Sequence, residues 1–383
     1  MGEIKVLHCL NAPSWGGLEI YSTELIQELH KTGLKQAVLC TPGSRAAEEL
    51  RAASVEVIFL PEKKFTKLQH AKIVRKLFTE RSFTHLHSHT RLDMWACALA
   101  KWNRPQIKHV YNLYMNALPK KDLFHKWLFS KVDALCTSSQ NILEDAKKNF
   151  PIAPEKLNLI RYGRKTEQYV HTPAKREELR AKYAVKPGQL VLGTLCRIDP
   201  GKGVRELVQA LDCLSDTEIQ KVQLWLIGDM TIVGRNADGS LQYEGPSKEL
   251  SDWIDLKKQE PRLKNHLVRI SFQKDYIPYI DALDIFALAS YNETYSLSIL
   301  DAMLMEKPVI GTNAGGTPEQ IGKNERGALV EPHSSLSIAE GIRHYLKNPS
   351  LIESQGKIAR KWVLAQHSWE LTLKETLAIY SKI

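Results

Sequence analysis

The sequence of 383 residues is long enough for two folded domains, because a single hydrophobic core rarely grows beyond about 250 to 300 residues. Its 43% hydrophobic and 25% charged content is ordinary for a globular protein and excludes a disordered or low-complexity chain. The formal net charge of +10 is uneven, since residues 1–185 hold 30 Lys and Arg against 18 Asp and Glu, whereas residues 186–383 hold 23 against 25.

The segments that would mark a membrane or exported protein are not apparent. Apolar runs such as the one from Asp281 are interrupted by charge before the roughly 18 residues that a membrane span needs. The first residues pass directly into a strand pattern, without the basic segment and apolar core of a signal peptide. Six single cysteines without a CxxC pair suit buried thiols in a reducing compartment. We therefore expect a cytoplasmic protein, peripheral on the inner face of the cytoplasmic membrane if its basic half binds lipid.

The first half of the chain alternates short apolar strands with amphipathic helices. Strand patterns occur at 4–10, 36–41, 55–60, 84–89, 107–113 and 134–139, and helical patterns at 18–31, 45–53, 92–102 and 121–132. Such alternation predicts βαβ units around a parallel sheet. The strand character then gives way to a polar, proline-containing stretch at 162–174, which we interpret as a linker.

A second alternation of the same kind follows the linker. Strand patterns occur at 189–198, 222–229, 266–272, 284–290 and 307–312, and a helical pattern covers 203–214. The sequence thus predicts an α/β fold of two doubly wound Rossmann-like domains facing across a cleft, an amino-terminal one over 1–165 and a carboxyl-terminal one over 175–365. The last segment indicates one or two helices, and the helix at about 366–383 could pack back on the first domain. The insertion at 230–249 is longer than an ordinary βα connection and predicts a functional lid or a mobile loop.

Two loops carry features that suit a phosphate group. Gly16 and Gly17 follow the first strand and precede a helix, where backbone amides can approach an anion, although a simple tight turn explains them equally well. In the second domain, Arg197 ends a strand and Lys202 follows in a Pro-Gly loop. These two cations suit a diphosphate, with exposed turn residues as the alternative. The dinucleotide-binding and P-loop patterns GxGxxG and GxxxxGK[ST] are both missing.

Histidines recur near the predicted strand ends of the first domain. His87 and His89 occupy alternate positions and should share one face of the sheet, and His109 lies in the next strand. A metal pair would need further ligands, and none occurs with suitable spacing, so we expect neither a metal nor another cofactor. One of the three histidines could face a ligand, and the alternative is that all are structural.

Two acids bracket the start of a predicted helix in the stretch YNETYSLSILDAM. Glu293 precedes that helix, with Thr294 and Ser296 as candidates for its cap, and Asp301 lies inside it. Eight helical residues rise about 12 Å and place the acids roughly 80° apart. A diphosphate at the helix end and a hydroxylated ring near each acid would match a nucleoside-diphosphate sugar. A capping acid and a solvated acid are the alternative.

Several of these motifs together are similar to a known family. The segments GGLE, RIDPGKG, the acid-x7-acid stretch ending in DAM, and KPVIGTNAGGTPEQI resemble the retaining glycosyltransferases of the two-Rossmann type, in particular glycosyltransferase family 4, over nearly the whole chain. The resemblance implies a nucleotide-sugar donor held mainly by the second domain, without a bound divalent metal. It further implies that Arg197 and Lys202 neutralise the diphosphate, that Glu293 meets the transferred sugar and that Asp301 takes the ribose. Backbone amides near Tyr295, Ser296 and Leu297 would hold phosphate. Gly17 would form part of the phosphate-contacting loop of the first domain, and Gly316 would also belong to the donor-binding residues.

The chain departs from the family pattern at three places. Asp301 replaces the usual Glu, Ser296 replaces a usual Gly, and either His109 or a substituted Tyr114 stands where the family often has a His. We predict a retaining glycosyltransferase that moves a sugar from a nucleoside-diphosphate sugar to an anionic or membrane-associated acceptor, such as lipopolysaccharide core, a phospholipid-linked glycan or another glycan. An NDP-sugar epimerase or phosphorylase of the same fold, or a non-catalytic binding protein, remains the alternative.

The basic residues of the first half suggest a second partner. They include Lys63, Lys64, Lys67, Lys72, Arg75, Lys76, Lys120, Lys121, Lys126 and Lys131. We expect an anionic membrane surface or a phosphorylated acceptor to bind there, with plain solubility as the alternative. Nucleic acid is not expected, because the cations are not interleaved with a regular set of aromatic residues.

Overall fold

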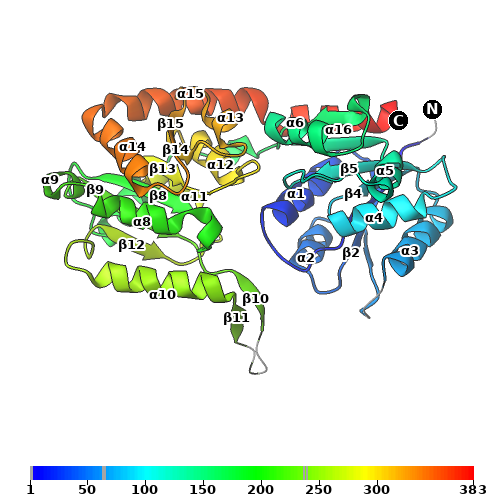
Figure 1. The fold of residues 1–383 in the computed structure, drawn as a ribbon, viewed down its shortest axis with the longest axis horizontal. Helices are drawn as coiled ribbons and strands as arrows, with labels where there is room; N and C mark the ends of the chain where they lie inside the picture. Colours follow the sequence, from blue (N-terminus) through cyan, green and yellow to red (C-terminus); the bar gives the residue numbers. More distant parts are fainter. Residues whose placement is uncertain (1–2, 63–65, 236–237, 239) are drawn as a thin grey trace. The chain divides into compact units, whose positions relative to one another are not determined.

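The computed structural model describes residues 3–62, 66–235, 238 and 240–383, so Lys63 and Lys64 of the basic set lie outside the described residues. The chain divides into two compact units (Figure 1). Unit 1 comprises Met1–Gly163 and His367–Ile383, and unit 2 comprises Arg164–Gln366. Each unit is an α/β structure around a parallel sheet, so the predicted class of two doubly wound domains is confirmed.

The sheet of unit 1 has the strand order β3-β2-β1-β4-β5-β6-β7, all parallel in the described residues. Its strands are β1 Lys5–Leu10, β2 Lys35–Cys40, β3 Val57–Phe59, β4 His85–Ser88, β5 Lys108–Leu113, β6 Ala134–Thr137 and β7 Leu157–Leu159. Its helices are α1 Gly17–Lys31, α2 Arg45–Ala52, α3 Lys67–Glu80, α4 Arg91–Ala100, α5 Leu123–Ser130, α6 Gln140–Asn149 and α16 Trp369–Lys382, with a short 3-10 turn at Pro154–Lys156. The strand order reverses between β1 and β4, which is where such sheets bind ligands.

The helices of unit 1 begin where short polar side chains can satisfy the first amides. Ser44, Thr66, Thr90, Asp122 and Ser139 precede α2 to α6, and each side chain accepts a hydrogen bond from a backbone amide three residues on. Such caps typically contribute about 1 kcal/mol each. The sequence places these caps between apolar strands and amphipathic helices, which explains why the predicted alternation formed.

The last helix, α16, belongs to unit 1 because of specific contacts with the end of the first segment. Thr372 Oγ1 donates to the carbonyl of Arg161 at 2.9 Å, and His367 Nδ1 lies 2.9 Å from the carbonyl of Tyr162. Gly163 packs against the Trp369 ring so closely that a Cβ there would lie 2.5 Å from it. The final segment therefore forms two helices, α15 in unit 2 and α16 in unit 1, separated at His367.

The sheet of unit 2 has the order β12-β9-β8-β13-β14-β15 and is also parallel throughout the part of the chain that is described. Its strands are β8 Leu190–Leu195, β9 Val222–Ile227, β12 Leu267–Ile270, β13 Ile285–Leu288, β14 Val309–Thr312 and β15 Gly327–Val330. Its helices are α7 Pro173–Lys182, α8 Val204–Asp212, α9 Asp216–Ile219, α10 Gly245–Gln259, α11 Ile277–Ala282, α12 Leu297–Leu304, α13 Thr317–Ile321, α14 Ser335–Lys347 and α15 Ser350–Gln366, with 3-10 turns at Thr166–Gln168 and Pro200–Lys202. Residues of α8, α10 and α14 share one buried apolar cluster with the strands.

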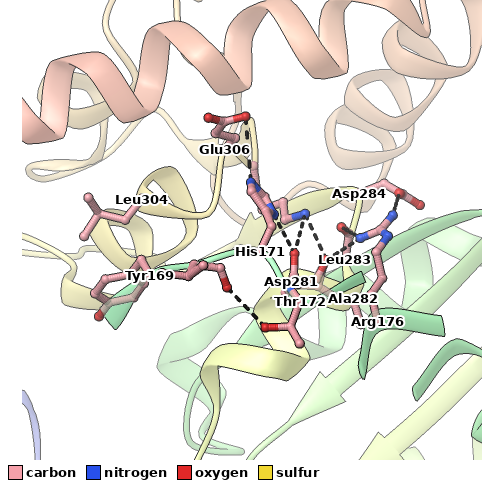
Figure 2. A network of polar contacts seen from close by, with 12 residues as sticks. Tyr169, His171, Thr172, Arg176, Asp281, Ala282, Leu283, Asp284, Leu304 and Glu306 are labelled. Atoms are coloured by element: carbon pink, nitrogen blue, oxygen red, sulfur yellow. Dashed lines mark hydrogen bonds and ion pairs between the residues drawn. The ribbon is translucent and has the colours of Figure 1, made fainter. Parts of the chain in front are cut away.

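The predicted linker is not loose where it enters unit 2. Figure 2 shows His171 and Thr172 bonded to the Asp281 carboxylate, each at 2.8 Å, while Arg176 reaches Asp284 and the Leu283 carbonyl. Asp281 is buried, so these contacts satisfy a charge that would otherwise be costly. The segment from Tyr169 onward is thus an integral part of unit 2.

The insertion at 230–249 contains a small antiparallel hairpin, β10 Ile232–Arg235 with β11 Leu241–Tyr243, followed by the start of α10. The hairpin extends away from the sheet of unit 2 (Figure 1). Residues 236, 237 and 239 of this insertion lie outside the described residues. The prediction of a lid or a mobile loop for this insertion is not tested by the hairpin. The strands β7 and β15 were not predicted, because each is short and only half-buried over part of its length.

Candidate functional site

The strand order of unit 2 reverses between β8 and β13, and the loops that follow these two strands meet. The amide of Tyr291, after β13, donates to the carbonyl of Gly201, after β8, at 3.0 Å. Gly203 is in the left-handed conformation, φ +64°, and a Cβ there would lie 2.0 Å from the carbonyl oxygen of Ala289. Glycine is therefore required for this close approach, which holds the two loops together at the carboxyl ends of the strands.

Lys202 and Glu293 form an ion pair where these loops meet. Lys202 Nζ donates to Glu293 Oε2 at 2.6 Å, and the two side chains keep 26% and 16% of their surface exposed. A cation for phosphate and an acid for sugar hydroxyls are thus adjacent and reachable from solvent. Arg197 lies on the same loop as Lys202 and is exposed, with Nη1 3.5 Å from Thr231 Oγ1. It therefore has a guanidinium available for an anion.

The two glycines after β14 let this loop approach the backbone of Glu293 and Thr294 closely. The amide of Gly316 donates to the Glu293 carbonyl at 2.7 Å. A Cβ on Gly315 would lie 2.0 Å from the same carbonyl, and one on Gly316 would lie 2.0 Å from that of Thr294. The amide of Gly316 is therefore already bonded and positions the backbone of Glu293, and the predicted donor contact of Gly316 stays a prediction.

Ser296 begins α12 as one of the two predicted caps, since its Oγ accepts a hydrogen bond from the Ile299 amide at 3.3 Å. Its own amide donates to Gln320 Oε1 at 3.0 Å, and Gln320 Nε2 donates to the Ser296 carbonyl at 2.8 Å. A phosphate contact was predicted for the amide of Ser296, but in this structure that amide is already bonded to Gln320. For the amide of Leu297 we find no acceptor within the described part of the chain. Tyr295 is buried next to this turn.

Gln320 was missed as a site residue. It lies in α13 and is fully buried, and its amide group makes two complementary hydrogen bonds with the backbone of Ser296. A Gln at a buried helical position, in a segment directly after two glycines, was the only available signal in the sequence.

Asp301 is bonded to groups of its own unit, and its predicted ribose contact stays a prediction. Asp301 is 4% exposed, and its Oδ1 accepts from Arg164 Nε at 2.8 Å and from the Tyr169 hydroxyl at 2.6 Å. Its Oδ2 accepts from the Tyr276 hydroxyl at 3.0 Å. Both oxygens are therefore used inside unit 2. The carboxylate compensates the buried charge of Arg164 and, together with burial, raises the pKa of Tyr169 and Tyr276.

The histidines of unit 1 separate into two sets. His87 and His89 share one face of the sheet, and His8 of β1 pairs in register with His87 on that same face. His109 is in register with Leu86 and so belongs to the opposite face, where Nε2 lies 2.8 Å from Ser88 Oγ. The register of β4 and β5 thus places His109 on the other side from His87 and His89, and a ligand-facing role for any of the three stays a prediction.

The histidines of the first set are neutral at ordinary pH. Burial lowers the pKa of His87 to about 4, and it lowers the pKa of His8 and His89 as well. Tyr114, the residue considered for the family's usual His, lies beside them with its hydroxyl 3.0 Å from His89 Nδ1.

Gly17 is the first residue of α1, after the strand β1. A Cβ at this position would meet none of the described atoms within 4 Å. Packing therefore does not demand glycine here, and open space remains beside the first turn of the helix. Its predicted phosphate contact stays a prediction.

Comparison with known proteins defines the class of this protein. The Glycosyltransferase Family 4 model matches residues 15–168, and the model of Glycosyl transferases group 1 matches residues 175–362. The chain is 22% identical to a D-inositol 3-phosphate glycosyltransferase of Corynebacterium glutamicum, over 96% of this chain and 91% of that protein. The enzyme is therefore a glycosyltransferase.

Solved structures agree on the fold. A glycosyltransferase from Rickettsia africae ESF-5 has a TM-score of 0.85 at 21% identity, covering 100% of this chain and 99% of that chain. Anabaena Alr3699/HepE, solved in complex with UDP and glucose, has a TM-score of 0.83 at 18% identity, covering 99% and 100%. Both units match, and the chain is a glycosyltransferase of the family 4 type with the two-Rossmann architecture, as its motifs indicated. Among the described helices, none has the length and apolar character needed to cross a bilayer.

Proposed function

We propose that this enzyme transfers a sugar from a nucleoside-diphosphate sugar with retention of configuration, without a catalytic metal, to an anionic or membrane-associated acceptor. The observation that carries the proposal is the Lys202–Glu293 pair, partly exposed at the strand-order reversal of unit 2. A similar protein, Anabaena Alr3699/HepE, was solved with UDP and glucose, which supports a nucleoside-diphosphate sugar as the donor.

The diphosphate of the donor would lie against Arg197, Lys202 and the first turn of α12. Arg197 offers a planar fork of donors and Lys202 a compact charge, both suited to phosphate oxygens. Of the three amides predicted to hold phosphate, that of Leu297 lies at the positive end of α12, while that of Ser296 is bonded to Gln320. When phosphate binds Lys202, Glu293 is released to accept hydrogen bonds from the hydroxyls of the transferred sugar.

The transfer step would be driven by electrostatic stabilisation of the leaving group. The bond between the anomeric carbon and the phosphate oxygen breaks, and the nucleoside diphosphate leaves with the electron pair. The acceptor oxygen bonds to the same face of the anomeric carbon, and its proton passes to the leaving phosphate oxygen. Positively charged groups held at the developing phosphate charge commonly account for a factor of about 10² or more in rate. Glu293 serves here as a sugar-positioning group rather than as a nucleophile.

Unit 1 offers a surface that suits an anionic acceptor or membrane. Around α5, four large apolar side chains are exposed, Met115, Leu118, Leu123 and Phe124, and Leu123 is 82% exposed. Lys121 and Lys126 are exposed beside them, and Lys120 and Lys131 are partly exposed. Apolar side chains that enter a lipid interface and cations that face anionic headgroups are the features of a peripheral membrane helix.

The donor assignment is tested by a thermal-shift and hydrolysis screen across UDP-, GDP- and ADP-sugars. A donor that binds only the folded enzyme raises the melting temperature by mass action, and one nucleotide series should do so saturably. Slow release of free sugar with the same nucleotide preference would support transfer chemistry. If no sugar nucleotide shifts the melting temperature at millimolar concentration, the donor proposal fails.

A further inference from the structure

Three histidines of unit 1 converge on one point on a single face of its sheet. His8 lies in β1, His87 in β4, and His89 directly after β4. One ligand atom of each lies within 4.8 Å of the other two, and the exposed fractions of the side chains are 0%, 1% and 1%. We propose that His8, His87 and His89 form a binding site for a divalent first-row transition metal ion such as Zn²⁺.

The hydrogen bonds of Gln36 determine which nitrogen of His8 is unprotonated. Gln36 Nε2 donates to the Ile26 carbonyl at 2.8 Å, so its Oε1 is the atom 3.0 Å from His8 Nε2. An oxygen accepts, and His8 Nε2 must therefore carry the proton. In the neutral ring Nδ1 is then unprotonated, and it points at His89 Nε2 at 3.1 Å.

The other two histidines also have a hydrogen-bond partner at one ring nitrogen. His87 Nδ1 lies 2.6 Å from the Tyr380 hydroxyl, and His89 Nδ1 lies 3.0 Å from the Tyr114 hydroxyl. Nε2 of His87 is buried and has no hydrogen-bond partner within the described chain. An outer partner on every ring is the usual arrangement around metal-binding histidines, since it fixes the tautomer and the ring orientation.

The spacing and protonation of the cluster suit a metal ion. Zinc–nitrogen bonds of about 2.0 to 2.1 Å in a tetrahedral site place ligand atoms somewhat over 3 Å apart. The pair of His8 and His89 already has this spacing. The unprotonated Nδ1 of His8, which follows from the hydrogen bond between His8 Nε2 and Gln36, faces His89 and offers a lone pair to an ion. No carboxylate or thiolate among the described residues joins them, which leaves a fourth position for water, hydroxide or an anionic oxygen.

The three histidines and the residues of the proposed transfer chemistry lie in different units. The histidines belong to unit 1, whereas Lys202, Glu293 and Arg197 belong to unit 2. Tyr380 lies in α16, so a bound ion would tie this last helix to strand β4 through His87. We therefore expect the ion to stabilise unit 1, and the inference does not depend on the proposed function.

The wild-type enzyme gives the first test. The metal content is measured by mass spectrometry after purification without added metal, and the metal-free protein is then titrated with Zn²⁺ and with Co²⁺. We expect one equivalent per chain, the intense visible absorption of tetrahedral Co²⁺, and a rise in melting temperature of about 5 °C or more at a hundredfold excess over Kd. Less than about a tenth of an equivalent, with neither absorption nor thermal shift, would overturn the proposal and leave a hydrogen-bonded histidine cluster.

Variants then locate the site. His87→Leu removes a ligand and should weaken Co²⁺ binding by more than about 100-fold, and Tyr380→Phe, which keeps all three ligands, should weaken it by about 10- to 100-fold. The matched control is His85→Gln, a buried histidine of the same strand that bonds Thr84 and the Tyr380 carbonyl instead of the cluster. If His87→Leu does not fold, Tyr380→Phe still decides. Binding unchanged in Tyr380→Phe, or lost equally in His85→Gln, contradicts this site.

Discussion

Lys202 and Arg197 are the two cations that the proposed mechanism needs at the diphosphate. Replacing either with Ala should lower kcat/KM by about 10²-fold or more, because each removes a donor from the developing phosphate charge. The free energy of unfolding should change little, since both side chains are at least partly exposed. Steady-state kinetics with the donor found by screening gives the measurement, and Lys258→Ala, an exposed lysine of α10, is the control. Near wild-type turnover in both variants would remove the phosphate assignment.

Replacing Glu293 should mainly change catalysis, whereas replacing Asp301 should mainly change the stability of the fold. Glu293→Gln should lower turnover and alter the sugar preference, with nucleoside diphosphate affinity nearly unchanged. Asp301→Ala leaves the Arg164 guanidinium buried without its carboxylate, and this should cost about 3 to 5 kcal/mol of unfolding free energy. Urea unfolding and calorimetric titration of the nucleoside diphosphate separate the two effects. An Asp301→Ala variant that is fully stable yet loses nucleotide affinity would support the ribose role.

The start of α12 depends on one side chain from another helix. Gln320→Ala removes two buried hydrogen bonds to the backbone of Ser296 and leaves that amide and carbonyl unpaired. We expect a loss of about 1 to 3 kcal/mol in unfolding free energy and faster amide hydrogen exchange at Ser296 and Ile299. Asn348→Ala, whose side chain bonds only the carbonyl of His344 at the exposed end of α14, is the control. Exchange rates unchanged in the α12 turn would show that Gln320 does not hold it.

Helix α5 and the loop before it are expected to bind anionic lipid. Replacing Lys120, Lys121, Lys126 and Lys131 with Gln should weaken binding to phosphatidylserine vesicles by roughly 1 kcal/mol per charge near the surface. Leu123→Ser with Phe124→Ser should weaken it further without a change in salt dependence, because the loss is apolar. Co-sedimentation at low and high salt measures both. If the enzyme still binds vesicles after all six replacements, these residues do not form a membrane-binding surface, and the basic residues serve solubility.

For the whole molecule, the proposed transfer predicts independence from added metal. A chelator should leave the initial rate at 25 °C intact, because Arg197, Lys202 and the α12 turn supply the positive charge at the phosphates. The same chelator should lower the melting temperature if the His8–His87–His89 site holds an ion, since removal of a ligand bound to the folded state destabilises it. Both quantities are measured on one preparation. Complete loss of turnover that Mg²⁺ or Mn²⁺ restores would contradict the metal-free mechanism.

The amino-acid sequence by itself determined the two α/β units, most of their strands, several of their helices and the family 4 type, because these follow from local periodicity, caps and contiguous motifs. It also placed Lys202 and Glu293 at strand ends that a parallel sheet brings together. Only the tertiary structure decided which polar side chains bond to one another. Asp301 turns inward to Arg164, 137 residues away, and His8 meets His89, 81 residues away, while Gln320 takes the Ser296 amide. Periodicity tells which face of an element is buried, but which polar groups meet there depends on sheet order, register and helix packing.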